Sequence, residues 1–183
     1  MIIEDGSGGG YAAAVDAENR LEVDAATAAK GLWINQVNED LYSASLSTTP
    51  SANGCFCYIK NLDERDMIFT RISIQCPAGQ TDGVEVRLNE AGTPAGGSTL
   101  TVTNRNAGSG GVADVTGLYG QNITGLSGGA SLGEFYLHNT GGSNVLRWWN
   151  GVIVPKNRTI TFYAHAGLIA LNFEIGRASC RER

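Results

Sequence analysis

The chain has 183 residues, which is the length of one domain or of one domain with an arm. Lys and Arg number 13 against 18 Asp and Glu, giving a net charge of −5 that argues against a nucleic-acid binder with clustered basic side chains. The apolar runs are only a few residues long, so the sequence predicts neither a membrane-spanning helix nor a secretory signal at its start.

Residues 1–31 differ in character from the rest of the chain. The Gly-rich run over residues 6–10 predicts a flexible linker that cannot contribute to a core. Two short semi-apolar patches follow, and Asp24 is a candidate cap for a brief helix over residues 25–30. We therefore predict an N-terminal arm over residues 1–31 that becomes ordered against a partner surface.

From residue 32 onward, apolar and polar residues alternate with a period of two, which is typical of half-buried strands. Gly- and Pro-rich turns separate these runs at short intervals. The pattern predicts an all-β fold, namely an antiparallel β-sandwich (jelly-roll-like) over residues 32–173, preceded by the extended arm. Strands are predicted over residues 41–46, 55–61, 71–76, 84–89, 99–103, 134–138, 144–149, 152–154, 159–163 and 168–173.

Residues 104–133 contain many glycines and lack the alternation seen on either side. We predict an irregular surface loop here. Long loops on a rigid sandwich are also the usual place for binding residues.

The cysteines do not form a recognisable metal or disulfide pattern. Cys55 and Cys57 form a C-x-C pair, Cys76 stands alone, and no second pair or nearby His completes four ligands. Residues i and i+2 of a strand share a face, so we expect reduced thiols on one side of a sheet. The sequence predicts no metal site and no cofactor.

No catalytic motif is present, and we predict that the protein is not an enzyme. Two histidines, His138 and His165, have no partner identifiable from the sequence. A pair of carboxylates for glycoside hydrolysis would have to lie across a cleft, and sequence alone does not place any two of them so. The carboxylates that could form such a pair are Asp66, Glu85, Asp114 and Glu134.

Trp148 and Trp149 are adjacent in a predicted strand, so their side chains should face opposite sides of the sheet. We expect one in the core and the other at a subunit interface, where Trp is enriched. The alternative is that the second ring forms a platform for a sugar.

The last ten residues, 174–183, read E-I-G-R-A-S-C-R-E-R and break the preceding pattern. One interpretation is a basic C-terminal tail. A common short-read sequencing adapter translates into the same ten residues when one G precedes it, so we predict that this segment is not native. The reading frame would then be truncated and of metagenomic origin, and Cys180 would be an artefact.

The arm resembles the opening of many tailed-bacteriophage structural proteins. It contains I-E-D-G-S-G followed by A-V-D-A-E-N-R-L-E-V, and Y-I-K-N at residues 58–61 and I-V-P-K at residues 153–156 resemble the same group more loosely. The arm residues that carry the match are Ile3, Glu4, Asp5, Gly6, Val15, Asp16, Asn19, Arg20 and Leu21.

This resemblance implies a virion structural protein, synthesised in the host bacterial cytoplasm and anchored to the particle by its arm. A capsid decoration protein is the favoured role, and a carbohydrate- or receptor-binding module of a tail or fibre is the alternative. The implied partners are other capsid or tail proteins and further copies of the chain, often as a trimer. A glycan is a partner only in the alternative, and neither nucleic acid nor a membrane is expected.

Overall fold

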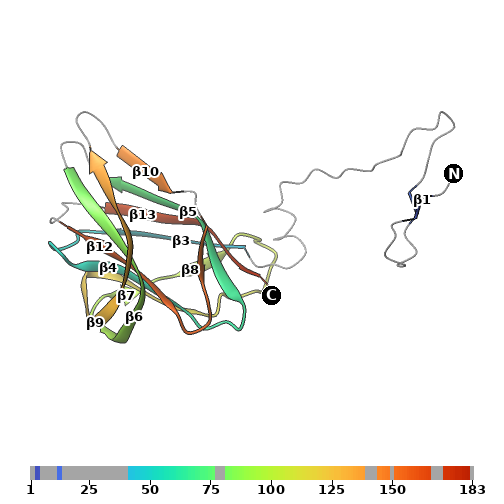
Figure 1. The fold of residues 1–183 in the computed structure, drawn as a ribbon, viewed down its shortest axis with the longest axis horizontal. Helices are drawn as coiled ribbons and strands as arrows, with labels where there is room; N and C mark the ends of the chain where they lie inside the picture. The colour runs from blue at the N-terminus through green and yellow to red at the C-terminus, as the bar shows by residue number, and fades with distance from the viewer. Residues whose placement is uncertain are drawn as a thin grey trace. The chain divides into compact units, whose positions relative to one another are not determined.

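The computed structural model describes residues 3–4, 12–13, 41–76, 81–138, 144–148, 151–165 and 171–181 (Figure 1). The chain divides into two units, Met1–Trp33 and Ile34–Arg183. Throughout the described residues the regular secondary structure is β-strand, so the predicted all-β class is confirmed. The strands of the second unit are β3 (Leu41–Thr48), β4 (Cys55–Asn61), β5 (Asp66–Cys76), β6 (Thr81–Ala95), β7 (Ser98–Thr99), β8 (Val102–Asn104), β9 (Val115–His138), β10 (Asn144–Trp148), β11 (Val152–Val154), β12 (Thr159–Ala164) and β13 (Leu171–Arg181).

The described residues of the first unit form a short antiparallel pair. Strand β1 (Ile3–Glu4) pairs with β2 (Ala12–Ala13), placing Ile3 opposite Ala13 and Glu4 opposite Ala12. The helix expected over residues 25–30 lies outside the described residues. The same is true of the remaining arm residues named above, which are Asp5, Gly6, Val15, Asp16, Asn19, Arg20 and Leu21.

The second unit consists of two antiparallel sheets with the strand order of a jelly roll. One sheet has the order β10-β5-β13-β3-β8, with β11 also paired to β5, and the other has the order β4-β12-β6-β9-β7. The chain crosses between the sheets from β3 to β4, β4 to β5 and β5 to β6, and again from β10 and β11 to β12 and from β12 to β13. This interleaving is the pattern of two Greek keys folded over one core.

The core between the sheets is built from the alternation seen in the sequence. In β12, Ile160 and Phe162 are fully buried, and the second sheet also contributes Phe56. From the first sheet, Phe173 meets both aromatic rings edge-on, with centroids 4.7 Å from Phe162 and 5.8 Å from Phe56. Because such edge-to-face pairs add to the hydrophobic gain of burial, these rings hold the two sheets together.

The prediction of an irregular loop over residues 104–133 is wrong for its larger part. Strand β9 has 24 residues, and its first part pairs with β4 while its second part pairs with β6. Glycines with positive φ at positions 125, 128, 129 and 133 let the strand bend and shift register. These irregularities removed the alternation on which the sequence-based prediction depended.

The bend in β9 closes the second sheet on itself. The pairings run from β4 to β12, from β12 to β6, from β6 to β9 and from β9 back to β4. A second, smaller hydrophobic cluster forms on this sheet from Cys55, Tyr58 and Ile123, with Leu118, Leu126 and Tyr163 packed against it.

The two thiols of the C-x-C pair do not share one hydrophobic cluster, contrary to the expectation from strand geometry. Cys57 belongs to the main core, whereas Cys55 belongs to the smaller cluster. The pairing of β4 with β9 shifts register between Cys55 and Cys57, and the pairing with β12 shifts between Phe162 and Tyr163. A bulge of this kind interrupts the period of two and separates the thiols. Cys76 ends β5.

Strand β13 includes most of the segment predicted to be an adapter translation. It lies between β5 and β3 and pairs with both, and both Phe173 and Ile175 are buried in the core. The regular pairing with both neighbours is interrupted between Ile175 and Ala178. The origin of residues 174–183 stays a prediction.

Candidate functional site

The described residues include only part of the predicted tryptophan pair. Trp148 is the last residue of β10, where its backbone lies opposite Ile72 of β5. Trp149 lies outside the described residues. The assignment of the pair to the core and an interface, or to a sugar platform, therefore stays a prediction.

Of the four candidate carboxylates, the fold brings two together. Glu85 of β6 and Glu134 of β9 are direct partners across the strand pair. Asp66 lies at the start of β5, and Asp114 precedes β9, where its carbonyl oxygen accepts hydrogen bonds from the backbone of residues 62 and 63. Since like charges directly opposite each other repel, the Glu85 and Glu134 pair needs compensation.

That compensation comes from basic and hydroxyl groups beside the two carboxylates. His165 lies with Nε2 at 3.2 Å from Glu134 Oε1, and the Tyr136 hydroxyl donates to Glu134 Oε2 at 2.8 Å. Arg87 donates from Nη2 to Glu85 Oε2 at 2.7 Å. This hydrogen bond from Arg87 is the main reason why the pKa of Glu85 is lowered.

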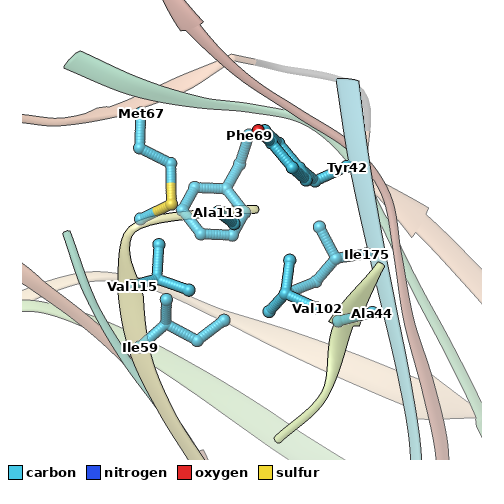
Figure 2. Close-up of a pocket in the computed structure, with 9 residues that line it drawn as sticks. All are labelled: Tyr42, Ala44, Ile59, Met67, Phe69, Val102, Ala113, Val115 and Ile175. Carbon is cyan, nitrogen blue, oxygen red and sulfur yellow. The ribbon is translucent and has the colours of Figure 1, made fainter. Parts of the chain in front are cut away.

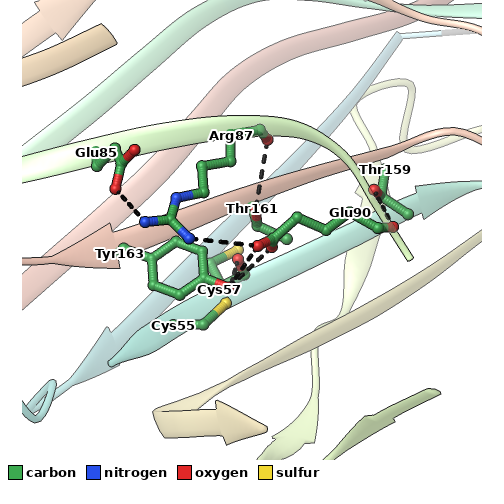
Figure 3. Close-up of polar contacts among 8 residues, drawn as sticks. All are labelled: Cys55, Cys57, Glu85, Arg87, Glu90, Thr159, Thr161 and Tyr163. Atoms are coloured by element: carbon green, nitrogen blue, oxygen red, sulfur yellow. Dashed lines mark hydrogen bonds and ion pairs between the residues drawn. The ribbon is translucent and has the colours of Figure 1, made fainter. Parts of the chain in front are cut away.

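A third carboxylate, Glu90 of β6, is buried, with only 1% of its side chain exposed (Figure 3). The Tyr163 hydroxyl donates to both of its carboxylate oxygens, at 2.8 and 2.9 Å. The Arg87 guanidinium lies 3.7 Å from Glu90 Oε1 and stacks over the Tyr163 ring at 4.4 Å from the centroid. Burial, followed by the hydrogen bond to Glu90, raises the pKa of Tyr163.

The buried thiols of Cys55 and Cys57 near this network are unreactive. Burial, reinforced by the negative charge of Glu90, raises the pKa of Cys55 to about 12. Burial also raises the pKa of Cys57. Because the thiolate is the reactive form of cysteine, neither group is a nucleophile near neutral pH.

These polar groups fasten three strands of the second sheet to one another. Each carboxylate has a partner: Glu85 has Arg87, Glu90 has Tyr163, and Glu134 has Tyr136 and His165. Glycoside hydrolysis instead needs two carboxyls facing each other across a cleft that holds the substrate. The three carboxylates and their partners therefore link β6, β9 and the end of β12 on one face of the sheet. The sequence analysis identified Glu85, Glu134 and His165 as candidates, but it could not predict that they lie close together.

The core contains a small apolar cavity of about 20 Å³ near the start of β3 (Figure 2). A space of this size corresponds to about one water molecule, and an apolar lining leaves such a space dry. The cavity is a packing defect rather than a binding site. Its lining residues are Tyr42, Ala44, Ile59, Met67, Phe69, Val102, Ala113, Val115 and Ile175.

A much larger hollow of about 650 Å³ runs over β3, β13 and β5 of the first sheet. Polar side chains make up most of its lining, together with Leu46, Phe173 and Tyr119, and it is the candidate binding surface among the described residues. Sequence reasoning missed it, although Ser45 and Ser47 on one strand and Ser73 and Gln75 on another alternate with apolar residues. Alternating polar residues show which face of a strand points outward. They do not show which strands lie next to one another in the sheet.

Within the described residues, no group of three or more His, Cys, Asp or Glu side chains is placed to hold a metal ion. No helix in that part of the chain is long and apolar enough to cross a membrane. Comparisons with protein-family models, curated proteins and solved structures gave no match.

Proposed function

We propose that the chain is a structural protein of a tailed-bacteriophage particle, synthesised in the bacterial cytoplasm and incorporated as a decoration of the head. Residues 1–31 act as the anchor, and the jelly roll is displayed on the particle surface. The partners are capsid or tail proteins and further copies of the same chain.

The observation that carries this proposal is the jelly-roll strand order in a chain whose arm resembles virion proteins. Jelly rolls recur in viral capsid proteins and in lectin domains. A fold alone hosts many functions, so the arm motif is what directs the choice.

Physical chemistry supports different roles for the two units, with the arm as the anchor and the jelly roll as the displayed domain. An arm rich in Gly and Ala buries little apolar surface by itself, and ordering it costs about 1–2 kcal/mol per residue in backbone entropy. Contacts with a particle would offset that cost. In the first sheet, β8 and β10 end the strand order and offer edges for a neighbouring subunit.

The test of the anchor is a deletion of residues 2–24. We expect the deleted chain to keep the far-ultraviolet circular dichroism of the jelly roll but to lose co-sedimentation with phage particles. Replacing residues 2–24 by a Gly/Ser linker of equal length should also abolish binding, which separates the motif from mere length. Retained binding by either variant would contradict the anchor.

The copy number in particles tests the role. Mass spectrometry of purified particles should detect the tryptic peptide of residues 72–87 at an abundance comparable to the major capsid protein. A few copies per particle would indicate that the protein belongs to the tail or a fibre. Detection only in soluble lysate would refute the structural role. A peptide containing Ser179 and Cys180 would contradict the adapter prediction.

A further inference from the structure

The hollow on the first sheet has the architecture of a binding site for a small polar molecule. Its volume of about 650 Å³ lies within the usual range for ligand sites, about 300–1,000 Å³. It runs over three adjacent strands in the middle of the sheet, so the backbone beneath it is held by hydrogen bonds on both sides of β13. The central strand of the groove is therefore held in place by both of its neighbours.

The polar side chains form two rungs across the three strands. One rung is Ser47, Asn172 and Gln75, which are direct partners on β3, β13 and β5. The next is Ser45, Glu174 and Ser73. Neighbouring strands lie about 4.8 Å apart and same-face residues about 7 Å apart along a strand, so the rungs form a regular grid.

The choice of residues explains why this face is hollow. Ser45, Ser47 and Ser73 are short, and Ser73 is buried although it lies in this polar lining. Arg71 also lines the hollow, and its Nη2 donates to Ser73 Oγ at 3.4 Å. Tyr119 of the second sheet adds an aromatic side chain to the lining.

The chemistry of the grid favours a neutral ligand with many hydroxyl groups. Serine hydroxyls and the amides of Asn172 and Gln75 each donate and accept hydrogen bonds. Among the described side chains of the lining, the charged groups are Arg71 and Glu174, whose charges are opposite. Ser is depleted and aromatic residues are enriched at the cores of protein interfaces, so this lining fits a protein partner less well.

We propose that this groove binds a neutral oligosaccharide, with Ser45, Ser47, Ser73, Gln75 and Asn172 supplying the hydrogen bonds. The site goes beyond the proposed structural role and does not depend on it. The five hydrogen-bonding residues lie outside the segment predicted to be non-native, whereas Glu174, which balances the charge of Arg71, lies within it.

The experiment uses the full chain on an array of immobilised neutral oligosaccharides of two to four hexose or N-acetylhexosamine units, followed by titration with the strongest ligand. Removing one hydrogen-bonding amide, in Gln75→Ala or Asn172→Ala, should weaken binding about threefold to tenfold. Filling the groove, in Ser47→Trp, should abolish binding. Gln121→Ala and Asn122→Ala change the same residue types at exposed positions of β9 and should leave affinity unchanged.

Circular dichroism and thermal midpoints of all variants establish that each is folded, so loss of binding reports on the groove. Absence of any signal from the wild-type chain would overturn the proposal. Binding that the groove variants leave intact would also overturn it, because the glycan would bind elsewhere. A groove variant that changes the oligomeric state in light scattering, without affecting glycan binding, would identify the face as a protein interface and refute the glycan site.

Discussion

Strands β6 and β9 approach each other closely at Gly125, and adding one methyl group there tests how much this contact contributes to the free energy of unfolding. A Cβ atom at Gly125, where φ is +79°, would lie 2.3 Å from the carbonyl oxygen of Thr93 on β6. At Gly128, where φ is +73°, a Cβ atom would have nothing within 4 Å. The two positions share a strand and a backbone conformation, so Gly128→Ala is a matched control for Gly125→Ala.

The expected free energies of unfolding differ because only one of the two substitutions forces the strands apart. Alanine in a left-handed conformation costs about 1–2 kcal/mol, and the gain from a less flexible unfolded chain offsets about 0.4–1 kcal/mol. Gly128→Ala should therefore destabilise by roughly 1 kcal/mol. At Gly125 the 2.3 Å contact must open by about 1 Å to reach an ordinary carbon–oxygen distance.

Opening this contact would disturb the neighbouring pairing of Ala95 with Thr124. Loss of one or two backbone hydrogen bonds adds about 1–3 kcal/mol, for a total of about 2–4 kcal/mol in Gly125→Ala. Urea denaturation followed by circular dichroism measures both values. Equal destabilisation by the two substitutions would refute the argument, since backbone conformation alone would then account for the effect.

Three further predictions concern the core and the buried polar network. Tyr163→Phe should lower the free energy of unfolding, measured by urea denaturation, by about 1–3 kcal/mol because Glu90 loses its hydroxyl donor. The control Tyr136→Phe, at a residue that is 67% exposed, should change the free energy of unfolding very little. Equal destabilisation by the two substitutions would contradict the argument from burial. Since burial raises the pKa of Cys55 from 9.0 to about 12, stability should be full below pH 9 and fall by a few kcal/mol as pH rises toward 12. Cys55→Ala should make that fall shallower, and an unchanged pH dependence would rule out this thiol as a contributor. Phe162→Ala should cost about 3–5 kcal/mol, measured by the thermal midpoint, because the ring is fully buried between the sheets, and a cost under about 1 kcal/mol would contradict its place in the core.

Alternation of apolar and polar residues, together with short apolar runs between turns, was sufficient to predict several strands. Cys55–Asn61 and Val152–Val154 have the predicted bounds, and Thr159–Ala164 extends one residue further than expected. Val152–Val154 alternates as expected, whereas Cys55–Asn61 has apolar residues in both clusters and was identified by its short apolar run between turn residues. The fold class follows from the number of such strands and from the turns between them.

The length of β9 and the closure of the second sheet were decided by tertiary structure. Residues 115–133 pair with β4 and β6, which are distant in sequence, and glycine backbones adopt bends that no side-chain pattern encodes. The same long-range pairing separates Cys55 from Cys57 by a register shift.

The candidate sites divide in the same way. The sequence by itself determined the arm motif, the residue types available for chemistry and the polar outer faces of the strands. Only the tertiary structure brought Glu85 opposite Glu134, buried Glu90 under Tyr163 and aligned the serine and amide rungs of β3, β13 and β5. The physical reason is that strand register and sheet order depend on contacts between segments far apart in the chain, and spacing along one segment does not contain them.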